Sequence, residues 1–197
     1  MSGNKLENIR VAAIMTDGFE QIEFTSPRDA LQAEGAVVHI LSPAERLVQG
    51  MHHTHMGDKF EVDVPIDQAN TEDYDAALIP GGAVNADKLR ENKSAQDFLR
   101  YMNEQNKPIA VICHGPWLLI SAGLVRGRKM TSYHTIKDDL VNAGAIWVDE
   151  PAVEDDNFLS SRSPGDLPEF NKHLVNKLAQ LEHAHAHLAA EYDLPDY

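Results

Sequence analysis

The hydrophobic and polar positions divide the chain into short apolar runs separated by amphipathic or polar segments. The apolar runs span 9–16, 36–41, 75–80 and 109–112. Continuous apolar runs of this length are typical of strands buried on both faces of a sheet. Helical spacing predicts helices over 28–34, 94–105, 117–122, 136–143 and 167–188. Thr25 or Ser26 is the expected cap of the first of these helices, with Pro27 at its first position.

Strands that alternate with helices indicate an α/β fold. We expect a three-layer sandwich of flavodoxin-like type, with a mostly parallel central sheet covered by helices on both faces. The segment 42–57 is interpreted as a loop or a pair of short strands, 60–64 as an edge strand and 153–162 as a hairpin. One domain is expected over 1–197, with a core over about 9–180 and a C-terminal tail over 183–197.

The stretch 107–123 carries the clearest chemical signal. An apolar strand ends there at Cys113, the only cysteine, and Gly115 and Pro116 lead directly into a helix that Gly123 terminates. A strand, a sharp turn and a helix of this kind resemble the elbow that displays the serine of many hydrolases. Because backbone amides and the helix dipole favour an anion at a helix start, we expect Cys113 to be activated as a thiolate.

Two further features follow predicted strands. Glu20 comes after the first strand, and the pair Gly81 and Gly82 comes after the strand over 75–80. Ligands of parallel sheets bind beyond the carboxyl ends of the strands, and paired glycines allow backbone amides to approach an anion closely. We therefore expect Glu20, the glycine pair and Cys113 to share one site.

Composition narrows the class of partner. A net charge of −14 disfavours nucleic acid and anionic membranes, and a single cysteine fits a reducing compartment, so we expect a cytoplasmic protein. The first residues show no secretory signal, and no apolar run reaches the roughly 20 residues that a membrane span requires. Neither a nucleotide fingerprint nor a metal motif is present, so no cofactor and no metal are expected. The two histidine clusters are interpreted as exposed side chains (His52, His53 and His55; His183, His185 and His187).

Five motifs together resemble the ThiJ/PfpI superfamily, a cysteine branch of the class I glutamine-amidotransferase-like fold. They are DGFEQIE, YDAALIPGG, AVICHGPWLLISAGLVRGRKMTSY, DDLVNAGAIWVDE and SSRSPGDLPEF, and the resemblance covers roughly residues 10–178. Within this superfamily the chain is most similar to the PfpI-type group of intracellular proteases, stress proteins and deglycases.

The resemblance implies a role for each candidate site residue. Cys113 matches the nucleophile, and Glu20 matches the buried carboxyl group that hydrogen-bonds the cysteine sulfur and acts as acid and base. His114 matches a histidine that pairs with an acidic residue of a neighbouring subunit, for which Asp87 is the candidate. The backbone amides of Gly82 and His114 would form the oxyanion hole.

The resemblance also implies the range of functions. The first is an intracellular stress-response enzyme that acts on reactive carbonyls, as a glyoxalase or protein deglycase, or on peptides as a PfpI-type cysteine hydrolase. The alternatives are a cysteine-based sensor of oxidative stress and a holdase chaperone with little enzymatic activity. The partners expected are small reactive carbonyls or glycated and damaged proteins and peptides. Family members also self-associate, which implies a homodimer or a higher homo-oligomer.

Overall fold

A seven-stranded sheet forms the centre of the computed structural model, which describes the backbone of residues 5–192 and the side chains of residues 5–181. Its strands lie in the order β11-β12-β8-β7-β1-β3-β6, and every neighbouring pair is parallel except β11 with β12. The strands are β1 (Arg10–Ile14), β3 (Val37–Ser42), β6 (Val64–Pro65), β7 (Ala76–Ile79), β8 (Ile109–Ile112), β11 (Ala152–Asp155) and β12 (Phe158–Ser161).

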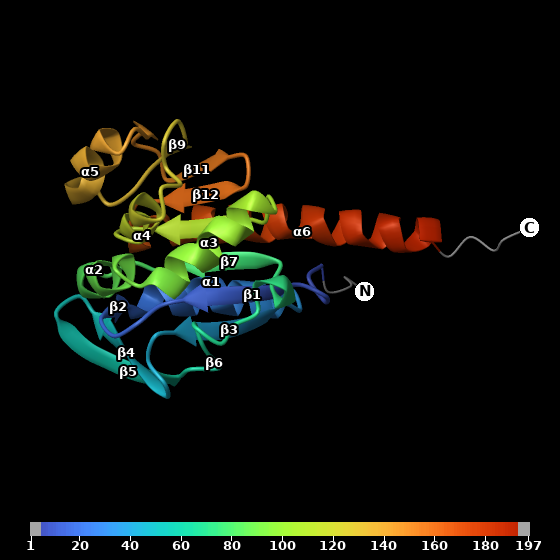
Figure 1. Cartoon of the computed structure of the whole chain (residues 1–197), viewed down its shortest axis with the longest axis horizontal. Helices are drawn as coiled ribbons and strands as arrows, with labels where there is room; N and C mark the ends of the chain where they lie inside the picture. Colours follow the sequence, from blue (N-terminus) through green and yellow to red (C-terminus); the bar gives the residue numbers. More distant parts are fainter. Residues whose placement is uncertain (1–4, 193–197) are drawn as a thin grey trace, which may run out of the picture.

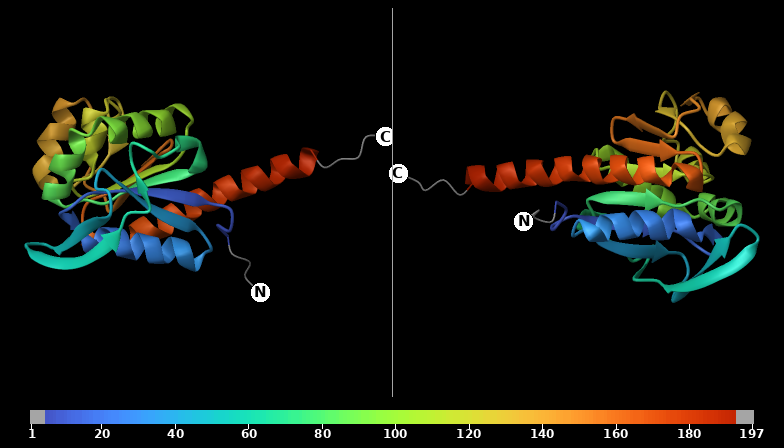
Figure 2. Two further views of the ribbon diagram at one scale, coloured as in Figure 1. Left: turned by 60° about the horizontal axis from the view of Figure 1, so that its bottom comes forward. Right: turned by 180° about the vertical axis from the view of Figure 1, so that it is seen from behind.

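Helices cover both faces of this sheet (Figures 1 and 2). Helices α1 (Gln21–Ala33) and α6 (Leu167–Tyr192) cover one face, and α2 (Ala83–Arg90), α3 (Lys93–Glu104), α4 (Pro116–Ser121) and α5 (Lys137–Asn142) cover the other. The alternation of β1 explains the two cores, because Val11 and Ala13 pack on the first face whereas Ala12 and Ile14 pack on the second. The α/β class and the mostly parallel sheet are thus confirmed.

Two smaller sheets flank the central one. Strands β2 (Phe19–Glu20), β4 (Leu47–His52) and β5 (His55–Glu61) form the first, in which β4 and β5 make an antiparallel hairpin. Strands β9 (Lys129–Met130) and β10 (Ile146–Trp147) form the second. The hairpin confirms the pair of short strands expected within 42–57. The edge strand expected over 60–64 is divided in the structure: Phe60 and Glu61 end β5, and Val64 begins β6, the edge strand of the central sheet. Phe60 packs against Phe19 and Phe24.

The first helix begins seven residues earlier than its capping signals predict. It starts at Gln21 rather than Arg28, and Pro27 lies inside it. The burial of Phe24 against Phe19 and Phe60 determines this start, since it places an aromatic contact on the inner face one turn before the proline. The difference matters for the site, because residues 21–23 form the first turn of a helix instead of a loop.

Two other helices also differ from expectation. Helix α2 was not predicted; it follows directly on Gly82, whose φ of 85° redirects the chain. Helix α6 continues to Tyr192, so the tail expected over 183–197 is helical as far as that residue. Residues 193–197 lie outside the described residues. The side chains of His183, His185 and His187 also lie outside the described set. Across residues 5–192, no helix combines the length and apolar character needed to cross a membrane.

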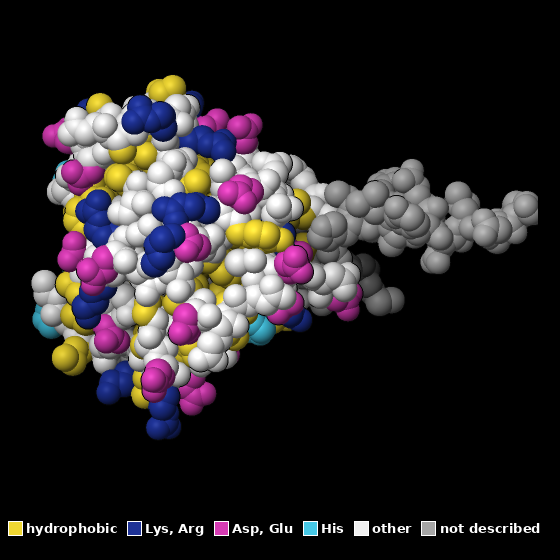
Figure 3. All heavy atoms as spheres, in the orientation of Figure 1, with side chains coloured by type: hydrophobic (Ala, Val, Ile, Leu, Met, Phe, Trp, Pro, Cys, Tyr) yellow, Lys and Arg dark blue, Asp and Glu magenta, His cyan; other side chains and the backbone are white. Residues whose placement is uncertain are grey.

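Acidic and basic side chains are mixed over the face seen in Figure 3, and neither sign forms a continuous patch there.

Candidate active site

The cysteine lies on a strained turn between β8 and α4. Cys113 has a φ of 63°, a left-handed conformation that costs a non-glycine residue about 1–3 kcal/mol. Its backbone is held on both sides, because its N–H donates to the Ser161 carbonyl (3.1 Å) and its carbonyl accepts from Tyr133 N–H (2.9 Å). A side chain at Gly115 would meet the Ile79 carbonyl oxygen at 2.9 Å, so the turn requires glycine there. The predicted elbow is confirmed.

The glycine pair after β7 faces this turn. The backbone N–H groups of Gly82 and His114 both donate to Cys113 Sγ. Both groups therefore point to the space beside the sulfur, where an oxyanion would form. A Cβ on Gly82 would come within 2.4 Å of the Gly18 carbonyl oxygen. Buried Asn85 fixes the loop, because it accepts from Thr16 N–H (2.7 Å) and donates to the carbonyl of Gly81 (2.9 Å).

Glu23, not Glu20, is the carboxyl group beside the cysteine. The Glu23 side chain is fully buried beside the Cys113 thiol and accepts the Gly81 N–H at 2.7 Å through Oε2, whereas Oε1 has no hydrogen-bond partner among the described residues. Burial raises the pKa of Glu23 to about 8, more than its hydrogen bonds lower it. The carboxyl group therefore carries its proton at neutral pH. The contact expected of Glu20 is corrected to Glu23 because helix α1 starts at Gln21 and turns residue 23 inward.

Glu20 lies next to this pair but bonds elsewhere. It stands at the residue before α1, and its Oε2 accepts the backbone N–H of His53 at 2.9 Å. The His53 ring, largely exposed at the tip of the β4–β5 hairpin, places Nδ1 3.8 Å from the same oxygen. Glu20 thus joins the hairpin to the body of the site.

His114 directly contacts the cysteine sulfur. Its Nδ1 lies 3.2 Å from Cys113 Sγ, and its Nε2 lies 3.5 Å from the hydroxyl of Thr135. The ring is stacked on Tyr133 (5.0 Å between centroids) and meets Trp117 edge to face. Burial lowers the pKa of His114, and the positive charge of nearby His134 lowers it further, so the neutral imidazole is favoured.

The thiol form of Cys113 is also favoured, contrary to the sequence-based expectation of a thiolate. Burial raises the pKa of Cys113 well above its ordinary range, and a negative charge on Glu23 raises it further. The amides of Gly82 and His114 act in the opposite direction but do not offset burial. Helix α4 has only six residues, so its dipole is small. Activation of this sulfur requires a base, and His114 Nδ1 is in contact with it.

Asp87 lies away from this cluster within the chain. It is exposed on α2 and lines a separate hollow of about 420 Å³ together with Lys88, Arg90, Glu91 and Ser121. One chain therefore does not bring Asp87 to its own His114, and their pairing between subunits stays a prediction. Within the described residues, no group of three histidine, cysteine or acidic side chains is arranged to hold a metal ion.

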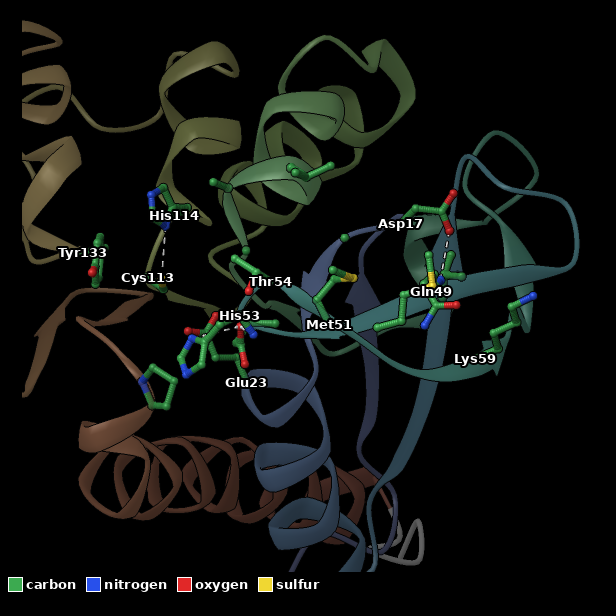
Figure 4. Close-up of a pocket in the computed structure, with 18 of the residues that line it drawn as sticks. Asp17, Glu23, Gln49, Met51, His53, Thr54, Lys59, Cys113, His114 and Tyr133 are labelled. Atoms are coloured by element: carbon green, nitrogen blue, oxygen red, sulfur yellow. Dashed lines mark hydrogen bonds and ion pairs between the residues drawn. The ribbon is translucent and has the colours of Figure 1, made fainter.

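A cavity of about 960 Å³ opens above Cys113. In Figure 4, one end of the cavity holds the catalytic candidates and their neighbours: Cys113, His114, Tyr133, Glu23 and His53. The other end holds the polar side chains of Asp17, Gln49 and Lys59, and Met51 and Thr54 lie between the two ends. The β4–β5 hairpin forms one long wall of this cavity. Sequence reasoning missed Glu23, although DGFEQIE contains both glutamates, three residues apart, as on one side of a helix.

Comparison with known proteins gives a consistent result. The model described as the DJ-1/PfpI family matches residues 9–177. The chain is 39% identical over 170 residues to Deglycase PfpI of Pyrococcus furiosus, covering 86% of this chain and 99% of that protein. It is 40% identical over 170 residues to the Bacillus subtilis protein named "Putative cysteine protease YraA", covering 86% and 98%. The crystal structure of Drosophila melanogaster DJ-1beta superposes with a TM-score of 0.80 at 28% identity, over 87% and 91% of the two chains.

Proposed function

Since the chain belongs to the DJ-1/PfpI family, we propose that it is a cysteine-dependent enzyme that acts on reactive carbonyls, with glyoxalase or deglycase activity. One observation carries the proposal. The Cys113 sulfur is in contact with a neutral base, His114 Nδ1 at 3.2 Å, and with a carboxyl group, Glu23, that keeps its proton near neutral pH.

These groups suffice for addition of the thiol to a carbonyl. As Sγ bonds to the carbonyl carbon, His114 Nδ1 takes the thiol proton, and the C=O electron pair moves onto oxygen. The N–H groups of Gly82 and His114 stabilise the resulting alkoxide, and Glu23 donates its proton to it. Overall, an adduct of methylglyoxal on an amine takes up one water and yields the free amine and lactate. The C–N bond of the adduct breaks as the aldehyde C=O forms, hydrogen moves from the aldehyde carbon of the thiol adduct to the ketone carbon, and water hydrolyses the resulting thioester to release the Cys113 thiol. The reaction balances without an oxidant or a reductant.

Peptide hydrolysis is the second candidate. The relative of B. subtilis is named for a protease, and the same sulfur, base and amides would serve attack on a peptide carbonyl. The cavity of about 960 Å³ is far larger than a three-carbon dicarbonyl, which supports a substrate carried on a peptide or protein in either case.

The assembly and setting of the enzyme belong to the same proposal. We expect a homodimer or higher homo-oligomer in the cytoplasm, acting on glycated proteins and peptides. Asp87 is the group through which a neighbouring subunit would support His114, because its carboxylate is exposed on α2.

The test is release of lactate from methylglyoxal-treated Nα-acetyl-arginine amide, with a casein peptide assayed in parallel. We expect Cys113→Ala to abolish turnover, because no other thiol exists in the chain. The control is Glu104→Gln on an exposed position of α3, which should keep wild-type turnover. Turnover that survives Cys113→Ala would refute the mechanism. A stable gain of two oxygens on Cys113 in mild peroxide, without turnover, would favour the sensor, and suppression of aggregation that survives Cys113→Ala would favour the holdase.

A further inference from the structure

The buried carboxylate of Glu20 takes no part in the proposed mechanism. Only 9% of the residue is exposed, and it lines the cavity above Cys113. The contact with the sulfur belongs to Glu23 instead. Burial of a carboxylate costs several kcal/mol unless partners compensate it. Among the described residues the partners of Glu20 are the backbone N–H and the largely exposed ring of His53, and both lie on Oε2.

The two oxygens of Glu20 have different surroundings. Oε2 is fixed by the His53 backbone N–H at 2.9 Å, which sets the orientation of the carboxylate. Oε1 accepts no hydrogen bond from any described residue, although the side chain borders the cavity. Glu20 is also close enough to Glu23 for its charge to raise the pKa of Glu23. Because Glu20 and Cys113 line the same cavity, Oε1 is the oxygen of Glu20 that remains for a ligand bound there.

The walls of the cavity complement a long, mainly aliphatic side chain that ends in a cation. Apolar side chains of the hairpin and of α2 line its length (Leu47, Val48, Met51, Met56, Ala83 and Val84). Lys59 lies beyond Gln49 at the far end in Figure 4, away from Cys113. A cationic nitrogen near Cys113 would therefore meet Glu20 without a competing lysine, and its methylene groups would contact the apolar wall.

We propose that Glu20 is a specificity-determining residue that selects carbonyl adducts on the guanidinium or ammonium nitrogen of a peptide over adducts on a thiol. The proposal rests on the carbonyl chemistry proposed for Cys113. A guanidinium or ammonium group donates a charge-assisted hydrogen bond to Oε1, whereas a thiol adduct offers neither the N–H nor the charge. The preference is then set by binding of the amine part of the substrate, not by the attack itself.

The first experiment measures binding without turnover. Nα-acetyl-arginine amide and its neutral isostere Nα-acetyl-citrulline amide are titrated calorimetrically into the wild-type protein, which needs no substitution to be informative. We expect the arginine compound to bind about 10-fold or more tightly, as for one charge-assisted hydrogen bond. Glu20→Gln keeps an acceptor for His53 N–H and should abolish the difference, whereas Glu104→Gln should retain it. Equal binding of the two compounds by the wild type would overturn the proposal.

The second experiment measures selectivity in turnover. The ratio of kcat/KM for methylglyoxal adducts of Nα-acetyl-arginine amide and N-acetylcysteine amide should fall about 10- to 100-fold in Glu20→Gln, mainly through KM for the arginine adduct. An effect of Glu20 exerted only through the pKa of Glu23 would change both adducts equally, leave the ratio unchanged and contradict the proposal. If the wild type turns over neither adduct but still prefers arginine to citrulline, the carbonyl chemistry fails and the cation site stands.

Discussion

Replacing Glu23 by glutamine should stabilise the protein at neutral pH, although it removes a buried hydrogen-bonded group. The amide oxygen of glutamine can still accept the Gly81 N–H, which the carboxyl oxygen accepts at 2.7 Å. The amide nitrogen takes the place of Oε1, which is buried and has no hydrogen-bond partner among the described residues, so the shape of the side chain near Cys113 is kept. What glutamine lacks is the ability to ionise in the unfolded chain, and the effect on stability follows from that difference.

The magnitude follows from the pKa of Glu23, which rises from its ordinary value of 4.5 to about 8 on folding. Below pH 4.5 both states are protonated, and the carboxyl contributes nothing to the pH dependence. Between the two pKa values the folded state holds a proton that the unfolded state has lost, so the free energy of unfolding decreases by about 1.4 kcal/mol per pH unit. The loss is about 3 kcal/mol at pH 7 and levels off at about 5 kcal/mol above pH 8.

Urea unfolding of the wild type and Glu23→Gln between pH 4 and 9 measures this difference. We expect the stability of the variant relative to the wild type to increase with pH across that interval, while other titrating groups cancel in the comparison. Glu104→Gln, the same substitution on an exposed side chain of α3, should run parallel to the wild type. A constant difference between Glu23→Gln and the wild type, or a variant that becomes relatively less stable as the pH rises, would refute the assignment of a protonated buried carboxyl.

Two further predictions concern activity and the glycine loop. The pH profile of kcat/KM should be bell-shaped. It rises as His114 loses its proton, at a pKa below the ordinary histidine value, and falls near pH 8 as Glu23 loses its proton. The profile of Glu23→Gln should therefore lack the alkaline decrease. Asn85→Ala should reduce the free energy of unfolding by about 2–4 kcal/mol in chemical denaturation, since it leaves the buried Thr16 N–H without its acceptor and removes the amide donor from the carbonyls of Pro80 and Gly81; a loss below 1 kcal/mol would contradict this.

The sequence by itself determined the class of fold and the position of the nucleophile. Buried parallel strands appear as continuous apolar runs, and the strands β1, β3, β7 and β8 all coincide with such runs. The turn at Cys113 was equally predictable, because an apolar strand, a glycine-proline pair and a helix succeed one another within a few residues. Both features are local, so the chain itself specifies them.

Only the tertiary structure decided which glutamate meets the sulfur. Glu20 and Glu23 belong to the same motif, and the capping signals at Thr25 to Pro27 favoured a later helix start. The aromatic contact of Phe24 with Phe60, 36 positions later in the chain, starts α1 at Gln21 and turns Glu23 into the core. For the same reason, the protonation states of Glu23 and Cys113 could not be predicted from the sequence. Burial raises the pKa values of Glu23 and Cys113, and burial arises from contacts between segments that are distant in the sequence.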